Sequence, residues 1–219
     1  TVYRKNLYTR WVDTTEGSYT YLEFKNRCDS LSRILTQYGV GSGDKVAILS
    51  QNMPNWSVAF FAIVPFGRIA VPILPESSEN EISNILSHSE SKAIFISKKL
   101  LPKLSQECMD KLDLIIEIET FDTIKRDPLK FTCDGKVAMP MPEDIATIIY
   151  TSGTTGTAKG VVLSHRNLTS NVISSYHAKK RNEKDRWLSI LPMPHTYELT
   201  IGMLYPMYCG ASVYYISKP

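Results

Sequence analysis

The stretch Tyr150-Thr-Ser-Gly-Thr-Thr-Gly-Thr-Ala-Lys-Gly160 combines three glycines, five aliphatic hydroxyl groups and one lysine. Apolar, β-prone runs flank it at residues 145–150 and 161–163. Glycines let backbone N–H groups turn inward, and converging N–H groups form a concave anion site. Hydroxyl groups add hydrogen-bond donors, and Lys159 adds a positive charge. The stretch therefore predicts a loop between two strands that binds a polyphosphate.

A weaker interpretation of the same stretch is a flexible hairpin or linker, because loops of glycine, serine and threonine are often no more than that. A lysine set between glycines, with β-prone runs on both sides, favours phosphate binding instead. The stretch also differs from the common nucleotide-binding loop, in which Gly-Lys-Ser/Thr precedes a helix. Here Ala158 precedes Lys159, and a predicted strand follows.

Strand and helix patterns alternate along most of the chain. Apolar runs at residues 45–50, 69–73 and 93–96 have the composition of buried strands, and helical patterns at 55–67 and 78–87 lie between them. This alternation predicts an α/β fold with mostly parallel sheets and flanking helices. Further strands are expected at residues 113–118, 186–190 and 211–216. Further helices are expected at residues 100–112, with a break near Pro102, at residues 166–180, and at residues 196–208, where Gly202 and Pro206 weaken the pattern.

The first helix and a polar segment define the expected division of the chain. Thr20 and Glu23 have the spacing of a capping box, which predicts a helix start. Residues 121–142 are polar and turn-rich, which indicates a linker. We therefore expect a first α/β subdomain in residues 1–120, and in residues 143–219 the start of a second one that carries the phosphate loop.

Composition excludes several classes of function. The net charge is only +3 and no basic run exceeds Lys179-Lys-Arg181, so nucleic-acid binding is not expected. Four widely spaced cysteines disfavour a zinc site or a disulfide framework and suit a reducing cytosol, which predicts a cytoplasmic protein. The weakly charged residues 51–75 are interrupted by Arg68 and by prolines, so they predict helix, turn and strand rather than a membrane span.

The glycine-rich stretch resembles the phosphate loop of adenylate-forming enzymes, which include acyl-CoA synthetases, peptide-synthetase adenylation domains and luciferases. Leu191-Pro-Met-Pro-His-Thr-Tyr-Glu198 resembles this family's second signature, beside the carboxylate substrate. Residues 43–48 and 52–56 resemble the family's opening, so the resemblance covers about the whole chain. The Pro-His-Thr-Tyr-Glu motif is most similar to long-chain fatty acid–CoA ligases. Ala158 replaces the family's usual proline, and because alanine does not fix φ, a slightly more mobile loop is expected.

The resemblance implies two half-reactions: a carboxylate attacks the α-phosphate of ATP to give acyl-AMP and pyrophosphate, and CoA then displaces AMP. It implies that ATP phosphates are bound by Thr151, Ser152, Gly153, Thr154, Thr155, Gly156, Thr157, Lys159 and Gly160, with the Thr151 hydroxyl near Mg²⁺. It places His195 beside the substrate carboxylate or α-phosphate, as a candidate catalytic residue. A histidine in a proline-rich turn is also a common structural donor, and no role is preferred for Tyr197 or Glu198. Trp56, Phe60, Phe61 and Trp187 are expected in the core.

Some parts of the family pattern have no counterpart in the 219 residues. These are the adenine- and ribose-binding segments, the acidic Mg²⁺ partner and the C-terminal domain with its catalytic lysine. We therefore expect an N-terminal fragment of a fatty acid–CoA ligase, inactive alone, with peripheral membrane contact through its substrates. The alternatives are an adenylating enzyme for an aryl or amino acid, a non-catalytic nucleotide-binding module, and a structural α/β domain.

Overall fold

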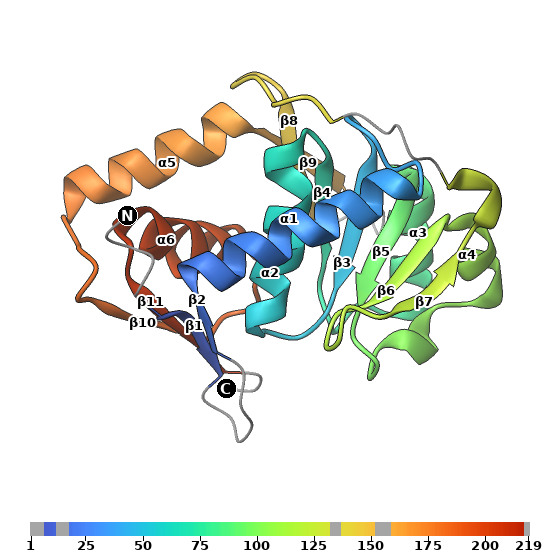
Figure 1. Ribbon diagram of the computed structural model, residues 1–219, viewed down its shortest axis with the longest axis horizontal. Helices are drawn as coiled ribbons and strands as arrows, with labels where there is room; N and C mark the ends of the chain where they lie inside the picture. The colour runs from blue at the N-terminus through green and yellow to red at the C-terminus, as the bar shows by residue number, and fades with distance from the viewer. Residues whose placement is uncertain (1–6, 12–17, 132–136, 152–158, 217–219) are drawn as a thin grey trace.

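A computed structural model describes residues 7–11, 18–131, 137–151 and 159–216, which form two β-sheets with helices around them (Figure 1). The larger sheet has the strand order β7-β6-β5-β3-β4-β8-β9, and the smaller has the order β10-β11-β1-β2. The larger sheet contains β3 (Lys45–Leu49), β4 (Ile69–Ile73), β5 (Ser91–Ile96), β6 (Leu114–Glu117), β7 (Thr123–Arg126), β8 (Ile145–Thr151) and β9 (Lys159–Ser164). The smaller contains β1 (Leu7–Trp11), β2 (Ser18–Thr20), β10 (Arg186–Ser189) and β11 (Ser212–Tyr215).

Several of the helices begin where short polar side chains cap them. The α-helices are α1 (Tyr21–Gln37), α2 (Pro54–Ile63), α3 (Glu79–Ser89), α4 (Gln106–Lys111), α5 (His165–Ala178) and α6 (Tyr205–Cys209). Thr20, Ser78 and Ser164 each accept the amide hydrogen of the residue three positions later, and that residue's side chain caps in return. The capping box predicted at Thr20 and Glu23 is confirmed.

The larger sheet is covered by helices on both faces. Strands β3, β4, β5, β6 and β8 run parallel, and the edge strands β7 and β9 run antiparallel to their neighbours. Leu49 and Ile73 pack in one core with α3 and α4, whereas Val46 and Ile48 pack in a second core with α1 and α2. The predicted α/β fold with a mostly parallel sheet and flanking helices is confirmed.

Helix α2 also connects the two sheets. The Ser57 and Tyr215 hydroxyl groups lie 2.6 Å apart in a buried hydrogen bond between α2 and β11. Trp56 and Phe60 are fully buried in the same helix, as predicted. Phe61 is only half-buried, on the surface of this core. Trp187 is also half-buried, and its ring meets Tyr205 edge-on at 5.3 Å between ring centroids.

The expected linker contains ordered structure. Strand β7 and the 3₁₀ turn η4 (Pro128–Lys130) lie within residues 121–142, and β7 pairs with β6. Strands β8 and β9 come after this segment but extend the same sheet as β3 to β6. At the other end, β1 pairs with β11 in parallel. Strands from before and after the segment therefore share each sheet, and the division into subdomains 1–120 and 143–219 stays a prediction.

Two expected helices, each containing a proline, are not single α-helices. Residues 100–112 form a 3₁₀ turn, η3 (Leu101–Lys103), and then α4, whose start is capped by the Ser105 hydroxyl. Residues 196–208 form a π-helix, η5 (Glu198–Leu204), that continues into α6. Proline has no N–H to donate to the preceding turn, so Pro102 and Pro206 favour breaks at these positions.

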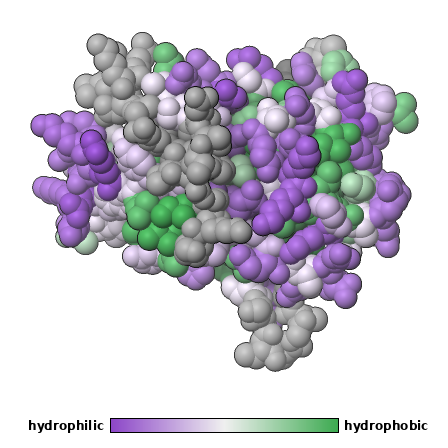
Figure 2. All heavy atoms as spheres, turned by 90° about the horizontal axis from the view of Figure 1, so that it is seen from below, coloured by the Kyte–Doolittle hydropathy of each residue, from purple (hydrophilic) through white to green (hydrophobic). Residues whose placement is uncertain are grey.

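The surface and the thiols agree with a globular protein. Figure 2 shows a face covered mainly by hydrophilic side chains, with hydrophobic ones in separate patches. Within the described ranges, no helix has the length and apolar character needed to cross a membrane. Cys28, Cys108 and Cys209 are buried free thiols, and Cys133 lies outside the described residues.

Candidate active site

The glycine-rich stretch forms a hairpin stem. Strands β8 and β9 pair antiparallel, with Thr151 opposite Lys159 and Tyr150 opposite Gly160. Thr151 and Lys159 are exposed at the open end of this stem. The loop residues Ser152, Gly153, Thr154, Thr155, Gly156, Thr157 and Ala158 lie outside the described residues. The strands on both sides of the predicted loop are thus in place, and the roles of its residues remain predictions.

Gly160 lets two side chains of β8 lie across the neighbouring strand. A Cβ atom at Gly160 would lie 2.9 Å from Ile148 Cγ2 and 3.3 Å from Tyr150 Cζ. The Tyr150 hydroxyl then reaches His88 of α3, where Oη and Nδ1 lie 2.7 Å apart. Burial raises the pKa of Tyr150, so the phenol stays protonated near neutral pH. This contact ties the stem to α3 immediately before Thr151.

The stem opens at the carboxyl edge of the larger sheet. Strand β8 runs parallel to β4, with Thr147 opposite Ala70, and the Thr147 hydroxyl donates to the Ala70 carbonyl oxygen at 2.9 Å. Strands β3 and β5 run parallel to the same set. Ligands of open parallel sheets bind outside the carboxyl ends of the strands. Thr151 and Lys159 therefore lie where this architecture commonly binds its ligand.

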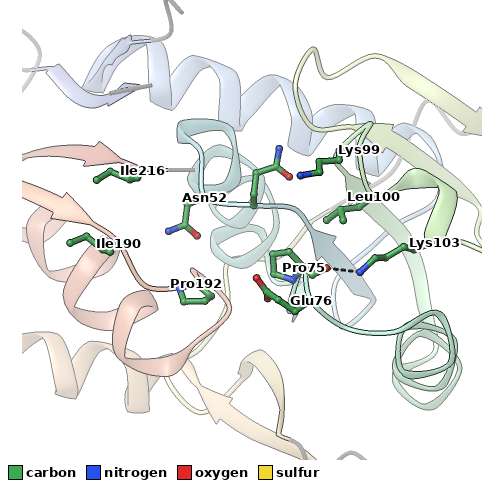
Figure 3. A pocket seen from close by; sticks show the side chains of 10 residues that line it. Asn52, Pro75, Glu76, Lys99, Leu100, Lys103, Ile190, Pro192 and Ile216 are labelled. Carbon is green, nitrogen blue, oxygen red and sulfur yellow. Dashed lines mark hydrogen bonds between the residues drawn. The ribbon is translucent and has the colours of Figure 1, made fainter. Parts of the chain in front are cut away.

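A cavity of about 410 Å³ lies at this edge, between the two sheets (Figure 3). Segments following β3, β4 and β5 form one part of its wall, and the ends of β10 and β11 form another. Its lining comprises Gln51, Asn52, Pro75, Glu76, Lys99, Leu100, Lys103, Ile190, Pro192 and Ile216. Lys103 Nζ donates to the carbonyl oxygens of Pro75 and Ser77, both at 2.8 Å. Two lysines and one carboxylate, Glu76, therefore line the cavity, so its lining has a small net positive charge.

His195 follows β10 in a tight turn. Its amide donates to the Pro192 carbonyl oxygen at 2.9 Å, and its own carbonyl accepts from the Leu199 amide at 2.9 Å. The exposed imidazole accepts the Tyr197 amide hydrogen at Nδ1, over 3.2 Å. A neutral imidazole that accepts at Nδ1 carries its proton on Nε2. That N–H is a suitable donor to a carboxylate or phosphate oxygen.

Two buried polar side chains beside His195 had no predicted role. Asn52 hydrogen-bonds the backbone of Leu191 and Met193, on either side of Pro192. Glu198 is only 4% exposed, and its Oε1 has no hydrogen-bond partner within the described part of the chain. The sequence pointed to Asn52 only within the family's opening motif and to Glu198 without a preferred role, because the fold brings their backbone neighbours close.

Burial raises the pKa of Glu198, and the Ser189 hydroxyl and the Leu191 and Ile190 amides oppose the rise. Its carboxyl group lies against Gly202, where a Cβ atom would be 2.2 Å from Oε1. Only glycine leaves room for the Glu198 carboxyl group at position 202. A glycine four residues after a glutamate was therefore the sequence feature that could have indicated a buried carboxyl group.

Metal binding needs ligands beyond this chain's described side chains. Those residues contain no group of three or more histidine, cysteine, aspartate or glutamate side chains able to hold a metal ion. Mg²⁺ prefers oxygen ligands and often takes them from substrate phosphates. The exposed Thr151 hydroxyl fits as one further oxygen ligand.

Comparison with known proteins supports this geometry. The family model described as "AMP-binding enzyme" matches residues 4–219. Long chain acyl-CoA synthetase 6, peroxisomal, from Arabidopsis thaliana is 31% identical over 92% of the chain and 32% of its own length. The chain spans about a third of the length of the curated relatives it matches.

Solved structures of the same fold are also similar. The N-terminal domain of FACL13 from Mycobacterium tuberculosis, bound to an inhibitor, has a TM-score of 0.85 at 25% identity, covering 100% of this chain and 55% of that one. ATP-bound MatB from Rhodopseudomonas palustris has a TM-score of 0.82 at 21% identity, covering 98% and 42%. With its family model matched over nearly the whole chain, this protein belongs to the AMP-binding, adenylate-forming enzymes.

Proposed function

We propose that this chain is the N-terminal part of an ATP-dependent fatty acid–CoA ligase that forms acyl-AMP and transfers the acyl group to CoA. The main observation in support is the β8–β9 stem, which presents Thr151 and Lys159 at the carboxyl edge of a mostly parallel sheet. The similarity to a long chain acyl-CoA synthetase supports the choice of acid.

The chemistry requires control of charge, because a carboxylate anion must approach a polyphosphate. Lys159 and the backbone N–H groups of the loop would neutralise the β- and γ-phosphates, with Mg²⁺ held by the phosphates and the Thr151 hydroxyl. His195, with its proton on Nε2, would bind the carboxylate or the α-phosphate. The positive charge of Lys99 and Lys103 suits the anionic substrates, ATP and CoA.

The test uses the full-length protein that contains this chain, incubated with ATP, Mg²⁺, CoA and a panel of acids. The panel contains medium- and long-chain fatty acids, an aryl acid and an amino acid. We expect AMP, pyrophosphate and acyl-CoA in equal amounts, with fatty acids as the best substrates. Preference for the aryl or amino acid would overturn the choice of acid, and ATP binding without AMP formation would favour a non-catalytic nucleotide-binding module.

Two further properties belong to the same proposal. Residues 1–219 alone are expected to form no acyl-CoA, because the other parts of the family pattern lie outside them. The protein is expected to act in the cytoplasm, with peripheral contact to membranes that supply its fatty acid. Fractionation of cells expressing the full-length protein checks this location.

A further inference from the structure

The side chain of Asn52 joins the two halves of the proposed site. Its Nδ2 donates to the Leu191 carbonyl oxygen at 2.7 Å, and its Oδ1 accepts from the Met193 amide at 3.0 Å. The residue is 6% exposed and lies in the wall of the cavity between the sheets (Figure 3). We propose that Asn52 is a positioning residue, which holds the His195 turn in register with the phosphate-loop edge of the larger sheet.

An asparagine side chain suits this task because it carries one donor and one acceptor on a short, planar group. Its two hydrogen bonds imitate those that a neighbouring strand would make to the backbone at Leu191 and Met193. Aspartate has nearly the same shape, but it has no donor for the Leu191 carbonyl oxygen and it adds a buried charge. Alanine reaches neither group and leaves both buried without these partners.

The held segment leads directly to His195. Met193 is fully buried, so its amide and side chain are both fixed. The Pro192 carbonyl oxygen, between the two held groups, accepts the His195 amide hydrogen. Asn52 therefore determines the position of the four-residue turn, Pro192 to His195, that ends at the imidazole.

Asn52 is also linked to the phosphate-loop edge, which is the carboxyl edge of the larger sheet where β8 ends. Asn52 comes three residues after β3, and β3 runs parallel to β4, with Leu49 opposite Ile73. Strand β4 in turn runs parallel to β8, which ends at Thr151. The carboxyl ends of all three strands share one edge, so a shift of the His195 turn would change its place relative to that edge. This inference rests on the proposed function.

Asn55 provides a matched control, because it is the same residue type three positions later, in the first turn of α2. It is 9% exposed, and its Nδ2 donates to the carbonyl oxygens of Ile118 and Glu119 at 2.7 and 2.8 Å. Its Oδ1 accepts from the Tyr19 hydroxyl at 2.6 Å. These partners lie outside the candidate site, so Asn55→Ala removes a comparable buried network without touching the His195 turn.

The experiment measures acid-dependent ATP–pyrophosphate exchange by the full-length protein and its variants. Since misplacing a reacting group by about 1 Å can cost on the order of 100-fold in rate, we expect Asn52→Ala and Asn52→Asp to lower kcat/KM for the acid by about 10- to 100-fold. The kcat/KM of Asn55→Ala should stay within about 3-fold of the wild-type value. Its thermal midpoint should fall about as much as that of Asn52→Ala. The aspartate variant keeps the shape of the side chain if the alanine variant does not fold.

A double-mutant cycle shows whether Asn52 acts through the histidine. If it does, Asn52→Ala has little further effect in a His195→Ala background. Equal losses in the Asn52→Ala and Asn55→Ala variants, or losses that multiply in the double variant, would overturn the inference and leave the proposed function standing. Wild-type protein without acid-dependent exchange would overturn both.

Discussion

The buried side chain of Glu198 is expected to make the stability of the protein depend on pH. Its carboxyl group is enclosed in the first turn of the π-helix η5, against Gly202. π-Helical turns break the regular i→i−4 pattern and often occur at functional sites. Here the turn brings a carboxyl group close to the residues that lead into His195, at the cost of removing its charge from water.

Replacing Glu198 by glutamine should therefore change stability in a pH-dependent way. Burial raises the folded-state pKa above the unfolded value of about 4.3, so wild-type protein loses stability as pH rises from that value through the folded pKa. Glutamine never ionises. The thermal midpoint of Glu198→Gln relative to wild type should thus increase between about pH 4.5 and pH 7.5. A midpoint difference that stays constant over this range would contradict the buried, ionising carboxyl group.

At the scale of elements, the β8–β9 stem flanks the predicted phosphate loop, and the contact between Tyr150 and His88 lies next to Thr151. The two rings also meet edge-on, with 5.7 Å between their centroids. Strand β9 is at the edge of the sheet, so among the described strands the stem pairs with the rest of the sheet through β8. We expect this anchor to fix the position of Thr151 at the end of the stem.

Tyr150→Phe keeps the ring over Gly160 and removes only the hydroxyl. Loss of one hydrogen bond costs about 0.5–1.5 kcal/mol, which corresponds to a rise of about 2- to 10-fold in the KM for ATP, with kcat little changed. His88→Ala should give a similar rise, and the double variant should be no worse than the larger single effect. ATP titrations of the full-length protein measure these values. Independent, multiplying effects would show that the two residues do not act together.

Elements made by local patterns were predictable from sequence, and those made by distant pairing were not. The buried strands at residues 45–50 and 69–73 are continuous apolar runs, because parallel strands covered on both faces need them. Strands β1 and β2 mix polar and aromatic residues, and β7 is mostly polar. They form because β11 pairs with β1, β1 pairs with β2, and β6 pairs with β7. The same limit applies to the site. Thr151 and Lys159 belong to a local motif, whereas Asn52 bonds to backbone 139 and 141 residues away.

At the scale of the whole molecule, the candidate site spans two sheets. The phosphate-loop stem belongs to the larger sheet, and His195 follows a strand of the smaller one. The sheets are joined through α2, by the buried contact of Ser57 with Tyr215 and by the Asn52 hydrogen bonds. Under the proposed function the two sheets must keep a fixed relation, so side chains at this junction are expected to affect the reaction rate.

The most direct test of the account is acid-dependent ATP–pyrophosphate exchange by the full-length protein, compared with Lys159→Ala and with a control, Lys184→Ala. Lys184 is an exposed lysine in the turn before β10, away from the stem. We expect exchange that requires a fatty acid, a loss of about 100-fold or more in kcat/KM for ATP in Lys159→Ala, and no loss in Lys184→Ala. Absence of exchange with every acid, or equal activity of the two variants, would contradict it.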